Sequence, residues 1–266
     1  MLREPFTEKF YTYHSKYIEN VLALRQPQRE SLEIFARLCD ILTFSKEPNL
    51  GAELEAVHAL FPTLSSFERD FPSFCFALAT GIGKTRLMGA CIAYLRYEKG
   101  IKNFFVMAPN LTIYDKLKAD LGNTSNPKYV FKGLDLFAKP PRIIDGDNYA
   151  DFRQGTFGVN DVVINVFNIS KLNAESKGKN GEPARIKRLN EVLGTSYFEY
   201  LQSLPDLCIF MDESHHYHAD KSFSVINELR PILGVELTAT PQIQKGAKKI
   251  DFKNVVYEYS LAHALN

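Results

Sequence analysis

The sequence predicts an α/β protein with a buried, mostly parallel β-sheet and helices on both faces of the sheet. Five short apolar runs alternate with segments of helical spacing, as buried strands joined by helices do. Each run ends in polar or turn residues, and open sheets of this kind bind ligands at the carboxyl ends of their strands. The 266 residues are 45% hydrophobic, which is enough for a real core.

The N-terminal part is expected to be helical. Leu32, Phe35, Leu38 and Leu42 recur at helical spacing, and the stretch SKEPNLG then interrupts the pattern. We therefore expect a helical segment over residues 1–70 and a sheet domain over residues 71–266. The expected strands span residues 73–79, 103–109, 161–167, 206–212 and 234–240.

Composition excludes several classes of protein. The net charge of +1 provides no overall basic field, so any nucleic-acid contact must come from a local patch. No apolar run approaches the roughly 20 residues that span a membrane, and the N-terminus lacks the apolar centre of a signal peptide. The four cysteines form no CxxC pair and are expected to be reduced core residues of a cytoplasmic protein: Cys39, Cys75, Cys91 and Cys208.

A phosphate-binding turn is predicted within FALATGIGKTRLMGACIAYL, residues 76–95. Gly81 and Gly83 follow an apolar strand and let backbone N–H groups point inward, and a helix N-terminus adds its positive dipole end. Lys84 would reach the β- and γ-phosphates, and the Thr85 hydroxyl would ligate Mg²⁺. The predicted nucleotide-binding residues of this turn are Thr80, Gly81, Ile82, Gly83, Lys84, Thr85 and Arg86.

The stretch MDESHHYHAD, residues 211–220, allows two interpretations, a transition-metal site or an acidic motif of a nucleotide hydrolase. No pair among its histidines has the i, i+4 spacing of HExxH, and no cysteine pair completes a tetrahedral set. A phosphate-binding turn needs a carboxylate for Mg²⁺ and one for the attacking water, and this apolar strand ends in Asp212 and Glu213. We therefore predict that Asp212 holds the metal and that Glu213, with Lys84, is catalytic. His216 and His218 stay unassigned.

The motifs ATGIGKT, DESH and LTATP occur in that order and together resemble motifs I, II and III of superfamily 2 helicases and translocases. The resemblance is strongest to the motor subunit of type III restriction enzymes. It covers roughly residues 20–262 and implies a first RecA-like P-loop NTPase domain that uses ATP and Mg²⁺. Leu78, Ile82 and Ser214 depart from the usual motif residues, and Pro27 stands where an aromatic residue often precedes the glutamine of an adenine-recognition motif.

The same resemblance implies further site residues. Gln28, with Arg25 nearby, would recognise adenine. His215, Thr238 and Thr240 would couple the nucleotide to DNA contacts. The stretches FFVMAPNLTIYDKL and DVVINVFNISKLN resemble motifs on the DNA side. The nucleic-acid-binding residues that they imply are Pro109, Asn110, Asn168 and Lys171.

The resemblance also implies partners. It predicts binding of double-stranded DNA and, in the complete enzyme, a modification methyltransferase subunit; no membrane partner is expected. Too few residues follow LTATP for a second RecA-like domain or a nuclease domain, so we expect the N-terminal part of a longer motor protein, nearly inactive alone. Two other functions stay open, an RNA helicase domain and a nucleotide-sensing interaction module. Residues 174–190 are expected to form a surface insertion, or a nucleic-acid contact through Arg185, Lys187 and Arg188.

Overall fold

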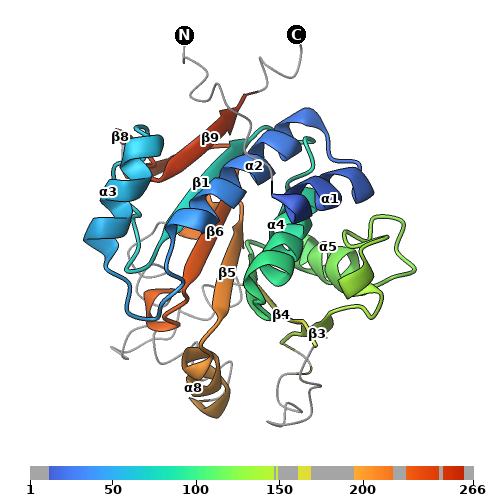
Figure 1. Ribbon diagram of the computed structural model, residues 1–266. Helices are drawn as coiled ribbons and strands as arrows, with labels where there is room; N and C mark the ends of the chain where they lie inside the picture. Colours follow the sequence, from blue (N-terminus) through green and yellow to red (C-terminus); the bar gives the residue numbers. More distant parts are fainter. Residues whose placement is uncertain are drawn as a thin grey trace.

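The computed structural model describes residues 12–146, 148, 161–168, 195–217, 226–245 and 248–260. Within these residues the centre of the molecule is a seven-stranded sheet with the order β3-β4-β2-β5-β6-β1-β9, in which every pairing is parallel (Figure 1). Its strands are β1 (Ser73–Leu78), β2 (Asn103–Ala108), β3 (Arg142–Ile144), β4 (Val163–Asn168), β5 (Leu207–Asp212), β6 (Leu233–Thr238) and β9 (Val255–Tyr259). The predicted α/β class is confirmed.

All five expected strands form, with ends displaced by one or two residues. The sequence did not reveal β3 and β9, the strands at the two edges of the sheet. It also missed the antiparallel pair β7 (Gln242–Lys245) and β8 (Lys248–Asp251). These strands are short, and the described side chains of β3, β8 and β9 are mostly only partly buried or exposed. They therefore lack the continuous apolar run by which a fully buried strand is recognised.

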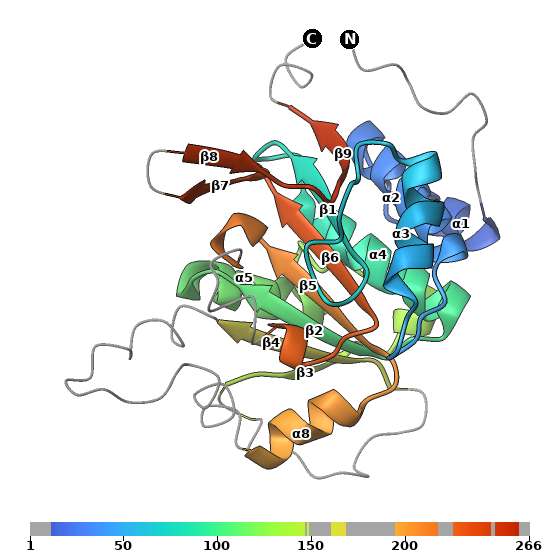
Figure 2. The same ribbon diagram turned by 90° about the vertical axis from the view of Figure 1, so that its left-hand side faces the viewer.

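Four long helices cover one face of the sheet. They are α1 (Tyr13–Val21), α2 (Gln26–Ile41), α4 (Lys84–Lys99) and α5 (Leu111–Gly122). A fifth helix, α3 (Leu50–Leu60), follows α2 and contacts it. Figure 2 shows α1 to α4 gathered on one side, while the β7–β8 pair extends away from them. The predicted helical segment is thus confirmed from Tyr13 onward.

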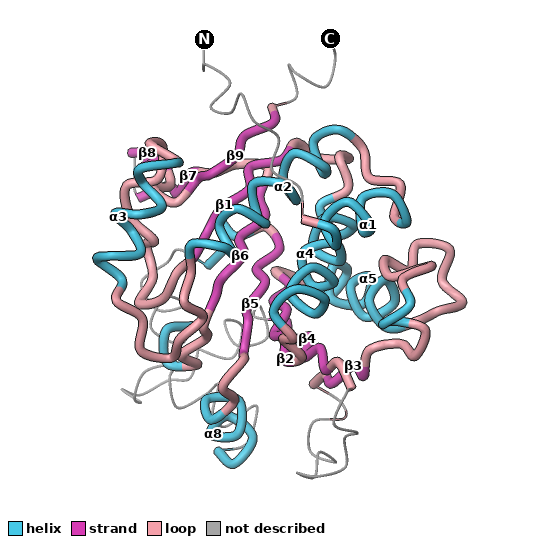
Figure 3. Tube along the Cα trace, in the orientation of Figure 1, coloured by secondary structure: helices cyan, strands magenta, loops and turns pink. Residues whose placement is uncertain are grey.

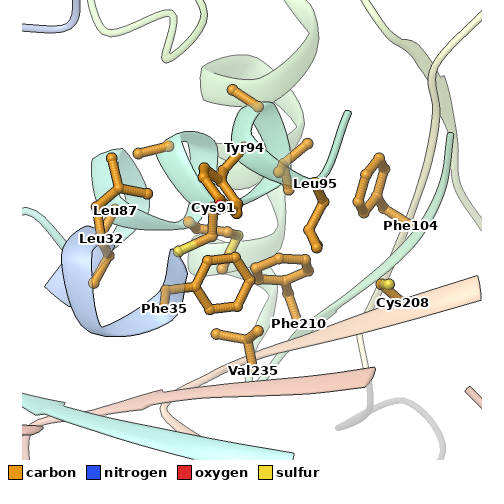
Figure 4. Packing of buried hydrophobic residues seen from close by; sticks show 14 of the residues in the cluster. Leu32, Phe35, Leu87, Cys91, Tyr94, Leu95, Phe104, Cys208, Phe210 and Val235 are labelled. Carbon is orange, nitrogen blue, oxygen red and sulfur yellow. The ribbon is translucent and has the colours of Figure 1, made fainter. Parts of the chain in front are cut away.

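The core on this face joins the N-terminal helices to the sheet. Leu32, Phe35 and Leu38 of α2 are buried, as their helical spacing predicted. The Phe35 ring centroid lies 6.4 Å from that of Phe76 in β1. It lies 6.0 Å from the ring centroid of Tyr94 in α4 (Figure 4). Burying aromatic side chains of this size contributes most of the stabilisation of such a core. The helical N-terminal segment and the sheet therefore share one hydrophobic core.

The other face is covered by α8 (Thr195–Ser203) and the short 3-10 helix η3 (Ser214–Tyr217). Phe198 and Leu201 of α8 join a second buried cluster, in which the ring of Phe105 in β2 stacks on Phe167 in β4 at 5.4 Å. Helices on both faces are therefore confirmed. None of the helices in the described residues is both long and apolar enough to cross a lipid bilayer.

All four cysteines are unpaired and buried, as predicted. Burial in apolar surroundings raises the pKa of each thiol above its ordinary value: Cys39, Cys75, Cys91 and Cys208. A thiol with a raised pKa carries little thiolate at neutral pH, and the thiolate is the reactive form. These side chains therefore act as packing groups.

A buried ion pair joins β6 to the segment that precedes β1. Arg69 Nε lies 3.3 Å from Glu236 Oε1 in β6, and both side chains are fully buried. The same carboxylate oxygen accepts hydrogen bonds from Ser73 Oγ at 3.0 Å and from Asn254 Nδ2 at 3.1 Å. This group connects the segment before β1, β1 itself, β6 and the segment before β9. We call these four residues the Glu236 cluster.

The strand order brings distant sequence segments to one edge of the sheet. β6 lies between β1 and β5, and all three run in the same direction, side by side across the centre of the molecule (Figure 3). In register, Thr238 is paired with Ala77, and Leu237 with Asp212. The carboxyl ends of the three strands therefore meet, and the segments that follow them are neighbours.

Candidate active site

The turn between β1 and α4 has the geometry of an anion cradle. Gly81 and Gly83 have φ angles of 87° and 95°, a region that residues with a Cβ rarely adopt. α4 begins directly at Lys84, so its free N–H groups and positive dipole end face the turn. The strand, turn and helix predicted from the sequence are confirmed.

Gln28 of α2 forms hydrogen bonds to the backbone of this turn. Its Nε2 donates to the carbonyl oxygens of Ile82 at 2.8 Å and Gly83 at 3.1 Å, and its Oε1 accepts from the Arg25 N–H at 2.9 Å. The side chain is buried, and a Cβ on Gly83 would lie 2.4 Å from Nε2. The backbone angle favours glycine at position 83, and a larger residue there would also displace the Gln28 amide from its hydrogen bonds to the turn.

Lys84 faces the acidic motif. Its Nζ lies 2.9 Å from Glu213 Oε1, and both side chains are largely buried. The Asp212 carboxylate accepts a hydrogen bond from the Glu213 N–H at 3.1 Å, and Glu213 has a φ of 51°. A positive φ at a residue other than glycine costs energy and is typical of sites where function demands an unusual backbone. Residues separated by about 130 positions in sequence thus form one charged centre.

A chain of contacts leads from Glu213 to the end of β6. His215 Nδ1 lies 3.6 Å from Glu213 Oε2 and 3.0 Å from Thr238 Oγ1. Thr238 Oγ1 in turn donates to the Thr240 carbonyl and accepts from the Thr240 N–H, each at 3.1 Å. The three residues predicted to couple the nucleotide to DNA are therefore in contact. Their coupling role stays a prediction.

Thr85 and Asp212 suit a hard divalent cation. Both are buried at the same charged centre, and each offers oxygen, which Mg²⁺ prefers. Burial and the neighbouring Glu213 raise the pKa of Asp212 to about 6, while Lys84 and Lys116 lower it. A buried carboxylate with a raised pKa lacks full compensation of its charge, and a metal ion would supply that compensation. The residues present therefore fit the Mg²⁺ predicted from the sequence.

Asp212→Asn is expected to stabilise the fold at pH 8. The pKa of Asp212 is raised from 3.8 to about 6, so ionising this carboxyl group destabilises the fold. The stability of the wild type is therefore highest with respect to this group below pH 3.8, and it falls as pH rises through about 6. The gain at pH 8 is about 2 to 3 kcal/mol in the free energy of unfolding, measured by urea denaturation with EDTA present.

The difference between variant and wild type is expected to shrink as pH falls and to vanish below pH 4. An equal difference at pH 4 and pH 8 would mean that the charge of Asp212 costs nothing in the fold.

Lys116 of α5 was not foreseen as part of this centre. Its Nζ donates to Thr85 Oγ1 at 3.0 Å. A single lysine on an amphipathic helix, 31 residues from its partner, resembles any solvated surface charge. No local pattern could have distinguished it, because the contact depends on how α5 packs beside α4.

The other predicted nucleotide-binding residues lie around the turn. Thr80 is exposed and Ile82 is partly buried. Arg25 and Arg86 are also exposed, and Arg86 donates from Nη1 to the Leu22 carbonyl at 2.6 Å. A cavity of about 260 Å³ opens beside Thr80, between the ends of β1, β6 and β9. Of the predicted nucleotide-binding residues, only Thr80 lines this cavity.

The predicted nucleic-acid contacts are more dispersed. Pro109 and Asn168 are buried at the ends of β2 and β4. Asn110 is exposed, and its Oδ1 accepts from the Ile113 N–H at 2.9 Å, which caps α5. Lys171 and the 174–190 segment, with Arg185, Lys187 and Arg188, lie outside the described residues. All of these stay predictions.

The remaining histidines of the acidic motif, His216 and His218, stay unassigned. His216 is exposed, and its ring centroid lies 4.2 Å from that of His215. His218 falls outside the described residues. Where the structure describes the chain, no three histidine, cysteine, aspartate or glutamate side chains gather in a way that could hold a metal ion.

Comparison with known protein families identifies one family that matches this chain. The model of the family described as "Type III restriction enzyme, res subunit" matches residues 13–243. The comparison with curated proteins finds no match.

Two solved structures are similar to the chain. One is the Sulfolobus solfataricus SWI2/SNF2 ATPase core in complex with dsDNA, at 16% identity and a TM-score of 0.41, over 91% of this chain and 34% of that chain. The other is a nuclease-deletion mutant of the Type ISP restriction-modification enzyme LlaGI in complex with a DNA substrate mimic, at 13% identity and a TM-score of 0.42, over 72% of this chain and 18% of that chain. This chain therefore spans only about a third or less of the length of either.

Proposed function

The chain belongs to the type III restriction enzyme res-subunit family, and from that premise we propose that its ATPase motor domain is driven by double-stranded DNA. ATP hydrolysis would move the protein along the duplex or change its state there. A modification methyltransferase subunit would supply target recognition in the complete enzyme. The observation that carries the proposal is the unbroken series of contacts from Lys84 through Glu213 and His215 to Thr238.

Each residue of the series has a distinct task. The turn amides and Lys84 bind phosphate oxygens, and Thr85 and Asp212 would hold Mg²⁺. ATP with Mg²⁺, when bound, supplies the transferable γ-phosphoryl group and a divalent charge that stabilises its oxygens. Glu213 orients water and accepts its proton. Because Lys84 is an ion-pair partner of Glu213, phosphate and carboxylate compete for the same ammonium group.

His215 gives the site a route to the rest of the domain. Its Nδ1 lies between the carboxylate of Glu213 and the hydroxyl of Thr238. If Glu213 moves, His215 loses one of these two partners and its contact with Thr238 changes. Thr238 and Thr240 lie at the start of the segment that leaves β6. A rearrangement there would change the surface offered to DNA, as the predicted coupling role requires.

ATP turnover by the complete enzyme, with and without polynucleotide, tests this proposal. Duplex DNA is expected to stimulate hydrolysis, and the stimulation should fall as salt rises, because phosphate contacts release counterions. Stimulation by RNA alone would favour an RNA helicase. Retained ATP binding with no turnover on any polynucleotide would favour a nucleotide-sensing module.

Gln28→Ala is expected to weaken nucleotide binding by about 1 to 2 kcal/mol, or five- to thirtyfold in affinity. Its amide stabilises the carbonyls of Ile82 and Gly83, so its loss should loosen the turn itself. Titrations with ATP and with GTP separate two roles. Equal weakening for both indicates support of the turn, whereas weakening for ATP alone indicates the adenine recognition predicted from the sequence.

A matched control for this variant is Gln26→Ala. Gln26 is exposed in the same first turn of α2 and donates to Glu30 Oε1 at 2.9 Å. Because its amide donates to Glu30 on the same helix, its removal should leave both affinities at the wild-type level. A similar loss in both variants would mean that α2 as a whole, and not the Gln28 amide, is responsible.

A further inference from the structure

Lys116 brings a second ammonium group to the phosphate and metal site. Its Nζ donates to the hydroxyl oxygen of Thr85 at 3.0 Å. That oxygen is the one through which Thr85 would ligate Mg²⁺. Lys84 lies on the other side of the same centre, 2.9 Å from Glu213. Two cations thus face the two carboxylates of the acidic motif.

The charge of the Lys116 ammonium opposes the binding of a divalent cation nearby. Lys84 and Lys116 both act on the Asp212 carboxylate and offset only part of the negative charge of the acidic motif. A divalent ion at Thr85 and Asp212 would stand within a few ångströms of the Lys116 ammonium, and like charges at that distance repel strongly. Lys116 and the metal therefore cannot both take their best positions.

We infer that Lys116 is a built-in competitor of Mg²⁺ at Thr85, which must move aside before the metal binds. This inference rests on the proposed function, because it assigns the metal to the ATP site. The competition lowers the affinity for the metal–nucleotide complex relative to the metal-free nucleotide. It therefore makes occupancy of the site depend on where the Lys116 side chain lies.

Asp120 is a second partner close to the Lys116 ammonium. Lys116 Nζ lies 4.0 Å from Asp120 Oδ2, one turn further along α5, and the lysine side chain is 49% exposed. The backbone of α5 is held in place by the Asn110 cap and by the buried Leu117. Because the side chain is half exposed and has a second partner on its own helix, it can leave Thr85 without a movement of α5.

The position of α5 connects this competition to the predicted DNA side. α5 begins directly after Asn110, the exposed residue that the sequence assigns to nucleic-acid contact. A ligand that shifts the start of α5 would also shift Lys116 relative to Thr85. Metal affinity would then respond to that ligand without any contact between the ligand and the metal site.

The test compares the binding of a fluorescent ADP analogue, methylanthraniloyl-ADP, in excess Mg²⁺ and in EDTA. The dissociation constant in EDTA divided by the one in Mg²⁺ reports how strongly the metal supports binding. This ratio does not depend on turnover. Lys116→Gln is expected to raise this ratio about three- to tenfold. Lys116→Arg keeps the charge and should stay near the wild-type ratio.

Lys118→Gln is the matched control. Lys118 lies on the same helix, and its Nζ lies 2.5 Å from Asp145 Oδ2, away from the site. Its ratio should equal that of the wild type. Nucleotide binding with an unchanged or lower ratio in Lys116→Gln would overturn the inference alone. Failure of the wild type to bind the analogue in either condition would overturn both the inference and the proposed function.

Discussion

Glu213→Gln is expected to lower ATP turnover by about 10²- to 10⁴-fold, the usual contribution of a positioned general base. The amide keeps the size and shape of the carboxylate but cannot accept a proton from water. Binding of ATP with Mg²⁺ should persist, because the turn, Lys84, Thr85 and Asp212 are untouched. Lys84 loses its ion-pair partner at 2.9 Å and becomes more available to phosphate.

Two measurements on the complete enzyme check this result, steady-state phosphate release at saturating ATP and equilibrium binding of the ADP analogue. Glu55→Gln makes the same change on an exposed face of α3 and should leave both quantities at the wild-type level. Turnover within a factor of about two of the wild type in Glu213→Gln would remove Glu213 from the mechanism. Loss of binding together with turnover would mean that Glu213 mainly holds Lys84 in place.

Arg69→Met is expected to destabilise the fold by about 3 to 5 kcal/mol, because it removes the cation beside a fully buried carboxylate. A typical domain is stable by only 5 to 15 kcal/mol, so this loss is a large part of the total. The Glu236 cluster connects β1 and β6, which carry the phosphate-binding turn and Thr238. Weakening it should therefore also loosen the edge of the sheet that forms the site.

Urea denaturation of three variants isolates the cause. Arg69→Met combined with Glu236→Gln removes both charges and should recover much of the loss, as replacing a whole buried pair does. Arg29→Met removes a half-exposed cation whose Nη1 lies 3.6 Å from Glu19 Oε1. Glu19 keeps Lys16 Nζ at 3.0 Å, so the change should cost about 1 kcal/mol or less. If Arg69→Met were as mild as Arg29→Met, the buried pair would not hold the strands together.

The strands were predictable where burial is complete on both faces. β1, β2, β4, β5 and β6 each form a buried row in a parallel sheet, which leaves a continuous apolar run in the sequence. β9 escaped prediction because an edge strand alternates between buried and half-exposed side chains and includes the exposed Glu258. Its place beside β1 is decided by pairing with a strand about 180 residues earlier.

The residues of the candidate site also fall into those that the local sequence predicts and those that it does not. Gly81, Gly83, Lys84 and Thr85 were predictable because the turn needs particular residue types at fixed local spacing, and no distant contact is required to recognise it. Asp212 and Glu213 were predictable because they end an apolar strand. Lys116 was not predictable, since its partner Thr85 lies on another helix.

By itself, therefore, the sequence determined the α/β class, the phosphate-binding turn and the acidic motif, because each depends on residue types within a few positions of one another. The tertiary structure decided which of these pieces meet. The order β5-β6-β1 brings Glu213 to Lys84 and places His215 against Thr238, and the packing of α5 beside α4 delivers Lys116 to Thr85. The burial that raises the pKa of Asp212 also exists only in the assembled fold, since desolvation comes from many distant residues packed around one carboxylate.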